Sequence, residues 1–302
     1  MGAQRLVGLG VCCALLLAWR VSSQELLRVK SDLVLVPVTV SDCREHPVQG
    51  LTKESFRVFD NGVEQTITHF SKDDAPISIG LVFDTSGSMR FRLDRSRLAA
   101  EAFFHAANPE DEFFLVDFAN TPTLSVPLTR DVSAIEERIA SAHSVGPTAL
   151  LDAIYLALNE MRKSHLPRKA ILVVSDGGDN DSRYTLNELR RALRESDVVI
   201  YSIGVFSRHA AKSKEEAAGP GLLRSLSEST GGRLIPVTDI LELPYIAVKV
   251  GIEMRNRYVL GYAPTKVRDD GRYHHLSVKL VAPSGMAGLR ASWRAGYYAP
   301  TP

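Results

Sequence analysis

One short run of the chain combines a carboxylate and two hydroxyls with the spacing of a metal-binding loop. Asp84, Ser86 and Ser88 stand at alternate positions of the sequence DTSGSM, directly after the apolar run 77–83. A turn from strand to helix can direct alternate side chains at one point, and hard cations such as Mg²⁺ prefer oxygen ligands in octahedral geometry. The run therefore predicts part of a divalent-cation site. The alternative is a polar turn that only caps the following helix.

Two later loops carry the same kinds of ligand. Thr148 precedes a predicted helix that begins at Ala149, and Asp176 follows the apolar run 170–174 as Asp84 follows the first one. Ligands of an open α/β sheet bind at the carboxyl ends of the strands where the strand order reverses, so loops after different strands can meet there. Both residues are therefore candidates for the same site as Asp84.

Together these residues resemble the metal-ion-dependent adhesion site of von Willebrand factor type A domains, whose pattern is Asp-x-Ser-x-Ser, then Thr, then Asp. The resemblance implies a divalent cation, Mg²⁺ first and Ca²⁺ or Mn²⁺ next, and a partner protein whose Asp or Glu completes the coordination. It also implies a doubly wound, mostly parallel six-stranded sheet flanked by helices over residues 76–255. A site that has lost its metal is the alternative. The resemblance assigns five residues as metal ligands: Asp84, Ser86, Ser88, Thr148 and Asp176.

The central part of the chain predicts an α/β domain, because apolar strand-like runs alternate with amphipathic helical ones between residues 77 and 254. After the first run, we predict strands at 112–118, 123–127, 169–174, 198–205 and 233–237. Helices are predicted at 93–107, 132–142, 149–163, 185–195, 221–229 and 241–255. The short turn between the strands 112–118 and 123–127 predicts a hairpin, which places one antiparallel strand at the edge of the sheet.

The flanks predict strands and tight turns without helical periodicity. Valines alternate along 32–41, and the turn Asp60-Asn61-Gly62 joins a strand at 56–59 to one at 63–70. Further strands are predicted at 258–261, 274–281 and 288–293. Neither flank has enough strands for a sandwich of its own. We therefore expect 24–75 and 256–302 to pair into one β-sandwich-like domain from which the α/β domain emerges, and two small independent β units are the alternative.

Short segments of both flanks are similar to an exported bacterial family called VWFA-related. These segments are VPVTV (36–40), LTKESF (51–56), GYAP (261–264) and GYYAP (296–300). The sequence CREH (43–46) departs from this pattern, since a glycine-bearing turn is expected there. The departure affects the first hairpin and not the metal site.

Residues 1–23 predict a secretory signal peptide, with Arg5, an apolar run over 6–19 and small residues before the cleavage position. An uncleaved anchor and a lipid on Cys12 or Cys13 are the alternatives. Cleavage after Ser23 removes two basic residues and no acidic one, so the net charge falls from +1 to −1. Nothing in that charge suggests an electrostatic nucleic-acid binder. With only Cys43 left, we expect a secreted, periplasmic or cell-surface protein without an internal disulfide.

Other functions are weaker predictions. A hydrolase or phosphotransferase could use Asp84 as nucleophile, but such enzymes usually carry a second aspartate where this chain has Ser86. No Gly-x-Ser-x-Gly elbow, phosphate-binding loop or His-Glu-x-x-His helix is present. We therefore expect a binding protein and not an enzyme. A third possibility is a structural component of a surface assembly in which the metal only stabilises the loops.

Four remaining features are predicted to be structural. His274 and His275 are adjacent on a strand and so face opposite sides, which disfavours a zinc site. Asp179 and Asp181 predict an acidic loop tip, because their spacing misses the Ca²⁺ loop pattern. The charged stretch 208–216 predicts a solvated loop, and the tyrosines at 297–298 predict packing of a terminal strand.

Overall fold

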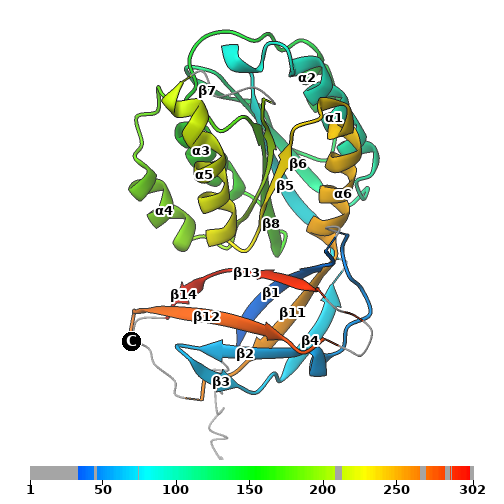
Figure 1. The fold of residues 1–302 in the computed structure, drawn as a ribbon, viewed down its shortest axis with the longest axis vertical. Helices are drawn as coiled ribbons and strands as arrows, with labels where there is room; N and C mark the ends of the chain where they lie inside the picture. The colour runs from blue at the N-terminus through cyan, green and yellow to red at the C-terminus, as the bar shows by residue number, and fades with distance from the viewer. Residues whose placement is uncertain are drawn as a thin grey trace, which may run out of the picture. The chain divides into compact units, whose positions relative to one another are not determined.

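The computed structural model describes residues 33–43, 46–73, 75–207, 213–265, 270–282, 286 and 288–299. The predicted signal peptide, with Cys12 and Cys13, lies outside these residues. From Asp32 onwards the chain forms one compact unit that contains an α/β domain and two further β-sheets (Figure 1). Across the described residues, no helix is both long enough and apolar enough to cross a membrane.

The α/β domain is built on a six-stranded sheet in the order β10-β9-β8-β5-β6-β7. Its strands are β5 (Ile77–Asp84), β6 (Glu112–Phe118), β7 (Pro122–Thr129), β8 (Arg168–Ser175), β9 (Val199–Val205) and β10 (Leu234–Val237). All neighbours run parallel except β6 and β7, which form the predicted antiparallel edge. Every residue of β5 and β9 is buried, which explains why these strands are mostly apolar in the sequence.

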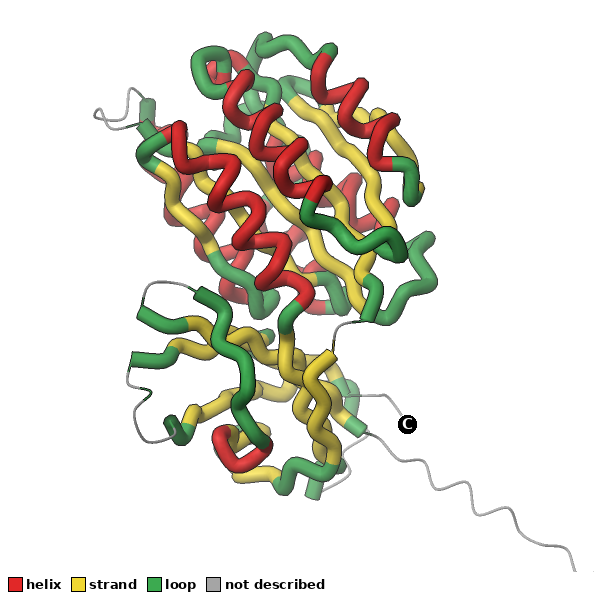
Figure 2. The backbone as a smooth tube through the Cα atoms, turned by 90° about the vertical axis from the view of Figure 1, so that its right-hand side faces the viewer, coloured by secondary structure: helices red, strands yellow, loops and turns green. Residues whose placement is uncertain are grey.

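Helices cover both faces of this sheet, as Figures 1 and 2 show. One face carries α1 (Leu93–His105), α2 (Val132–Ala140) and α6 (Leu243–Arg255). The other face carries α3 (Leu150–Met161), α4 (Leu186–Arg194) and α5 (Lys214–Ser229). The predicted fold, a mostly parallel six-stranded sheet flanked by helices, is therefore confirmed.

The start of α5 was predicted wrongly. The helix begins at Lys214 and not at Gly221, so the predicted loop 208–216 ends at Ser213, with 208–212 outside the described residues. The Ser213 side chain accepts a hydrogen bond from the backbone N–H of Glu216 and caps the helix. Gly219 and Pro220, which normally interrupt helices, conceal this start in the sequence.

Segments from both ends of the chain form two four-stranded sheets, in the orders β13-β1-β11-β4 and β14-β12-β2-β3. The strands are β1 (Val34–Ser41), β2 (Phe56–Asp60), β3 (Val63–Gln65), β4 (His69–Asp73), β11 (Arg257–Tyr262), β12 (Tyr273–Leu280), β13 (Arg290–Trp293) and β14 (Gly296–Tyr298). N-terminal β1 pairs with C-terminal β11 and β13, and β2 pairs with β12. One shared core lies between the sheets, so the predicted single sandwich is confirmed over the alternative of two independent units.

The strand predicted at 63–70 is in fact two strands in different sheets. Its first part, β3, forms the expected hairpin with β2 through Asn61 and Gly62, whose φ values of 46° and 80° fit a tight hairpin turn. The chain then crosses to the other sheet: Ile67 enters the core, and Thr68 donates its backbone N–H to the carbonyl of Gly261 (2.8 Å). The alternation of apolar and polar residues in the sequence continues across 63–70, so it does not show that the chain changes sheets there.

Arg168, at the start of β8, binds both chain segments that connect the sandwich with the α/β domain. Its guanidinium donates to the carbonyl of Ala75 (3.0 Å) where the chain enters the α/β domain. It also donates to the carbonyls of Met254 and Arg255 (2.8 Å each) where the chain leaves. One side chain therefore fixes the entry and the exit of the inserted domain.

A buried carboxylate organises the core of the sandwich. Asp60 accepts hydrogen bonds from the hydroxyls of Tyr262 (2.8 Å) and Tyr297 (2.9 Å), and Nδ1 of His274 lies 2.9 Å from its other oxygen. His274 is buried and His275 is exposed, as expected for adjacent strand residues. Burial and the hydrogen bonds to Tyr297 and Asp60 raise the pKa of Tyr262, so this phenol stays a donor at all ordinary pH values.

Replacing Asp60 by alanine should destabilise the protein strongly, because the hydroxyls of Tyr262 and Tyr297 and the Nδ1 atom of His274 lose their partner. We expect a loss of about 3 kcal/mol in the free energy of unfolding and a drop of about 10 °C in Tm. Asp270→Ala is the matched control, since Asp270 is more exposed and lies 3.6 Å from Nε2 of His274. Urea denaturation of both variants measures the difference, and equal losses would contradict a central role for Asp60.

Candidate metal centre

Asp84 and Asp176 lie at the carboxyl ends of two neighbouring strands. Asp84 ends β5, Asp176 follows β8, and the parallel register places Phe83 opposite Val174. The strand order reverses between β5 and β8, because β6 and β7 continue the sheet on one side and β9 and β10 on the other. The two carboxylates therefore stand at the switch point of the sheet, where open α/β sheets bind ligands.

The first loop gathers its three predicted ligands closely. One oxygen of Asp84 accepts the backbone N–H of Ser86 (2.8 Å), and the other accepts the hydroxyl of Ser175 (2.5 Å). The hydroxyls of Ser86 and Ser88 lie 3.1 Å apart. Asp84 and Ser86 are fully buried, whereas Ser88 is exposed. The hydroxyl of Ser88 therefore faces the solvent edge of a cluster whose other members are enclosed.

Asp176 is held by the backbone that follows it. One of its oxygens accepts the N–H of Gly178 (3.1 Å), and Gly177 donates its N–H to the hydroxyl of Ser175 (2.9 Å). Gly177 has a φ of +79°, and a Cβ there would lie 2.6 Å from the carbonyl oxygen of Gly219 in α5. Glycine is therefore required for the close packing of α5 against the Asp176 loop.

Thr148 is tied to the Asp176 loop through its backbone. Its N–H donates to the side-chain oxygen of Asn180 (2.8 Å), and its carbonyl accepts the N–H groups of Asn180 (2.9 Å) and Asp181 (3.1 Å). Nearby Asp179 accepts from the hydroxyl of Ser182 (2.5 Å) and the N–H of Leu151 (3.2 Å). Asp179 therefore forms hydrogen bonds within its own loop.

The Thr148 loop is also bonded to the Asp84 loop. Gly87 donates its N–H to the carbonyl of Gly146 (2.9 Å), and Val145 donates its N–H to the carbonyl of Thr85 (2.9 Å). The hydroxyl of Ser144 adds a bond to the carbonyl of Ser86. The three loops that carry the five predicted residues therefore form one hydrogen-bonded assembly at the switch point.

The electrostatics of this edge favour a cation. Burial, and then the negative charge of Asp176, raise the pKa of Asp84 from 3.8 to about 7, although hydrogen bonds from Ser175 and Ser86 oppose the shift. Two buried carboxylates that repel each other are stabilised by a positive ion between them. Two carboxylates and three neutral hydroxyls fit a hard divalent cation. Among the described residues, no group of three or more His, Cys, Asp or Glu could hold a metal, so any site here depends on the hydroxyls.

Arg92 is a member of this site that the sequence did not reveal. Its guanidinium donates to Oδ2 of Asp176 (3.2 Å) and lies 3.5 Å from the carbonyl of Ser88. The Arg92 side chain is 18% exposed and that of Asp176 only 3%. Its only sequence signal is its place four residues after Ser88, at the start of α1. Arg92 thus places a positive charge on a carboxylate that is also a predicted metal ligand.

Comparison with known proteins identifies the α/β domain. Residues 79–178 match the family model of the von Willebrand factor type A domain. The chain contains a von Willebrand factor type A domain. The fold agrees: the solved structure of a von Willebrand factor type A protein from Catenulispora acidiphila has a TM-score of 0.52 at 11% identity, over 89% of this chain and 74% of that one.

Two curated bacterial proteins share part of the sequence. An uncharacterized protein of Borreliella burgdorferi is 26% identical over 188 residues, which cover 55% of each chain. A UPF0353 protein of Mycolicibacterium paratuberculosis is 33% identical over 114 residues, or 34% of each chain. The aligned part therefore spans about half of the first relative and a third of the second.

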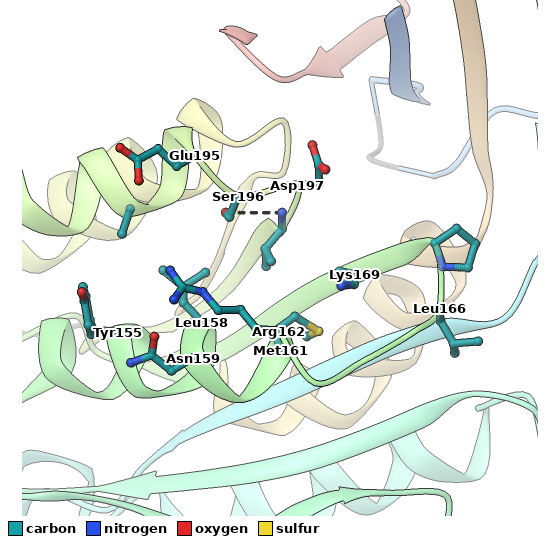
Figure 3. Close-up of a pocket in the computed structure, with 13 residues that line it drawn as sticks. Tyr155, Leu158, Asn159, Met161, Arg162, Leu166, Lys169, Glu195, Ser196 and Asp197 are labelled. Atoms are coloured by element: carbon teal, nitrogen blue, oxygen red, sulfur yellow. Dashed lines mark hydrogen bonds between the residues drawn. The ribbon is translucent and has the colours of Figure 1, made fainter. Parts of the chain in front are cut away.

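A separate hollow of about 330 Å³ opens near the amino ends of β8 and β9, beside α3 and α4 (Figure 3). Its lining mixes charges of both signs, with Arg162 and Lys169 on one side and Glu195 and Asp197 on the other. Asp197 already pairs with Arg294 at 3.0 Å. The charged side chains around the hollow therefore do not form a set of oxygen ligands for a cation, in contrast to the edge of the sheet that holds Asp84.

Asp84→Asn should stabilise the metal-free protein, because it removes a buried charge. The folded chain takes up a proton on Asp84 below about pH 7, which the unfolded chain does only near pH 4. The cost of burying this carboxylate is therefore greatest above pH 7 and falls as the pH drops towards 4, by about 1.4 kcal/mol per pH unit. In EDTA at pH 8 we expect Tm to rise by roughly 5 °C. Thermal melts at pH 8 and pH 4.5 measure this, and a gain that does not shrink at pH 4.5 would contradict it.

Arg92→Gln should tighten cation binding, because Arg92 competes for Asp176. We expect about a tenfold lower Kd for Mg²⁺, equivalent to about 1.4 kcal/mol. Arg90→Gln is the control, since Arg90 is exposed and contacts the ring of Phe91. Calorimetric titration with MgCl₂ measures both variants. Weaker binding by Arg92→Gln would show that Arg92 supports the site and does not compete with the cation.

Proposed function

We propose that the von Willebrand factor type A domain binds a divalent cation and uses it to bind a partner protein. The ligands are Asp84, Ser86, Ser88, Thr148 and Asp176, with Mg²⁺ the first choice of metal and Ca²⁺ or Mn²⁺ the next. The observation that carries the proposal is the pair of mutually repelling, buried carboxylates at the switch point, joined by hydroxyl-bearing loops. Domains of this family commonly act as metal-dependent interaction modules, which is consistent with this role.

The donor set suits recognition of a carboxylate. The charges of Asp84 and Asp176 offset the 2+ charge of the ion, while the three neutral hydroxyls leave its Lewis acidity intact. An Asp or Glu of the partner would complete the coordination in place of water. The exposed position of Ser88 supports this arrangement, because it puts the solvent side of the cluster within reach of another protein.

We favour binding over catalysis. Asp84 stands where aspartyl-phosphate enzymes carry their nucleophile, but Ser86 occupies the position at which such enzymes usually carry a second aspartate for acid–base work. We propose that this activity lies outside the cytoplasm, in the periplasm, at the cell surface or in the medium, because residues 1–23 predict a secretory signal peptide. A structural role, in which the cation only stabilises the loops, is the second candidate.

Removal of individual hydroxyls tests the proposed ligand set. Ser86→Ala and Thr148→Ala should each weaken Mg²⁺ binding by about tenfold, and Asp176→Ala should weaken it further because it removes a charge. Thr123→Ala is the control, because this exposed hydroxyl lies on β7. Calorimetry and the Mg²⁺-dependent rise in Tm report binding. A wild-type protein that binds no cation at millimolar Mg²⁺ would contradict the proposal.

A further inference from the structure

We propose that the hollow between α3 and α4 binds a free amino acid with an apolar side chain. Its carboxylate would face Arg162 and Lys169, and its ammonium would face Glu195. The hollow lies at the amino ends of β8 and β9, whereas Asp84 and Asp176 stand at the carboxyl ends of their strands. The two sites are therefore separate, and binding in the hollow should need no metal.

The floor of the hollow is apolar. It is formed by Leu158 and Met161 of α3 and by Val198, which precedes β9, and all three are buried. They belong to the core on this face of the sheet, so the hollow opens directly onto packed apolar side chains. Its volume of about 330 Å³ is at the lower end of the range for ligand sites, roughly 300–1,000 Å³. The space therefore suits a small ligand with an apolar part.

Lys169 brings a positive charge onto this apolar face. Alternate residues of a strand share a face, so its side chain stands on the same side of β8 as Ile171 and Val173, which belong to the core under α3 and α4. Its neighbour across the sheet, Ser78, donates instead to Glu112 (3.1 Å). Lys169 is half-buried, and its ammonium has no ion-pair or hydrogen-bond partner among the described residues. A lysine in this setting normally has a partner, so its place favours an anionic ligand group.

The charges around the hollow divide between two walls, as Figure 3 shows. Arg162 stands with Lys169 on the side of α3 and β8, whereas Glu195 and Asp197 stand on the side of the turn after α4. Asp197 pairs with Arg294 (3.0 Å). In the described part of the chain, the side chains of Arg162 and Glu195 have no charged partner, like that of Lys169. Two cationic groups and one anionic group are therefore left for a ligand.

Nearby basic residues do not change this arrangement, because they do not line the hollow: Lys163, His165, Arg168, Arg191 and Arg194. Nζ of Lys163 lies 2.6 Å from the carboxylate of Glu160. The guanidinium of Arg194 lies 5.6 Å from the centre of the Tyr273 ring. The contacts of Arg168 are with backbone carbonyls, as described above.

A zwitterion with an apolar side chain matches the floor and both walls. Its carboxylate would accept hydrogen bonds from Arg162 and Lys169, its ammonium would donate to Glu195, and its side chain would cover the floor. An inorganic anion has no apolar part and leaves Glu195 unused. The carboxyl end of a peptide carries one of the two charges only. A free amino acid such as leucine carries all three features.

Leucine and its analogues separate these features. 4-Methylpentanoate is leucine without the amine, 3-methylbutylamine is leucine without the carboxylate, and glycine lacks the apolar side chain. NMR titration of the full chain in EDTA measures each affinity. We expect leucine to bind about tenfold more tightly than any of the three, and to shift signals of the residues that line the hollow.

Two variants assign the charges. Lys169→Met should weaken leucine binding about tenfold and leave 3-methylbutylamine, which has no carboxylate, unchanged. Glu195→Gln should weaken leucine and 3-methylbutylamine and leave 4-methylpentanoate unchanged. Lys249→Met is the matched control for Lys169→Met, because Lys249 is also half-buried but lies on α6, with its Nζ 5.5 Å from the ring of Tyr245. None of these substitutions removes an ion pair of the described residues.

The possible outcomes are distinct. Equal affinities for leucine and 4-methylpentanoate would show a site for apolar acids and overturn the zwitterion. No binding of leucine at millimolar concentration, or equal binding by Lys169→Met and the wild-type protein, would overturn the site itself. Tighter binding of N-acetylleucine, which imitates the carboxyl end of a peptide, would identify a chain terminus as the occupant and overturn the assignment to a free amino acid. All these titrations are made without metal, so their failure leaves the proposed function standing.

Discussion

The repulsion between two buried carboxylates is the main electrostatic constraint at the proposed metal centre. Asp84 and Asp176 end neighbouring parallel strands, so the register of β5 and β8 brings them together whether or not their charges are compensated. Burial of like charges is costly. The surrounding groups offset that cost in part: Ser175 and the backbone of Ser86 donate to Asp84, and Arg92 donates to Asp176. A divalent cation would compensate both charges at once.

The rest of the fold keeps these groups in place. Central strands buried on both faces fix the positions of the two carboxylates, and hydrogen bonds between loops fix the hydroxyls relative to them. Gly177 lets α5 approach the Asp176 loop to a distance that any side chain would prevent. At the opposite end of β8, Arg168 binds both connections to the sandwich. The proposed metal centre is therefore built on a rigid sheet.

Much of this organisation could be predicted from the sequence because it depends on local patterns. Strand β6 was predicted with its observed ends, since apolar residues are bounded there by clear turn signals. The alternate spacing in the first loop and the position of Asp176 after a buried strand indicated residues that the structure brings to one edge. The pairing of the two flanks followed from counting strands, because neither flank could cover a sheet alone.

The features that the sequence did not show depend on contacts between distant residues. Arg92 reaches a carboxylate 84 positions away, and no local pattern records that contact. The split of 63–70 into β3 and β4 follows from a change of sheet at Ile67, although the residue pattern continues across it. Ser213 starts α5 despite Gly219 and Pro220, because a cap and tertiary packing outweigh local propensity.

A crystal structure of the full chain grown in millimolar Mg²⁺ with an aspartate-containing peptide tests the central claim most directly. We predict one cation with oxygen ligands from the loops of Asp84, Thr148 and Asp176, and the peptide carboxylate in its coordination shell. A cluster without a cation under these conditions, with the guanidinium of Arg92 still on Asp176, would contradict the claim that this edge is a metal-dependent binding site.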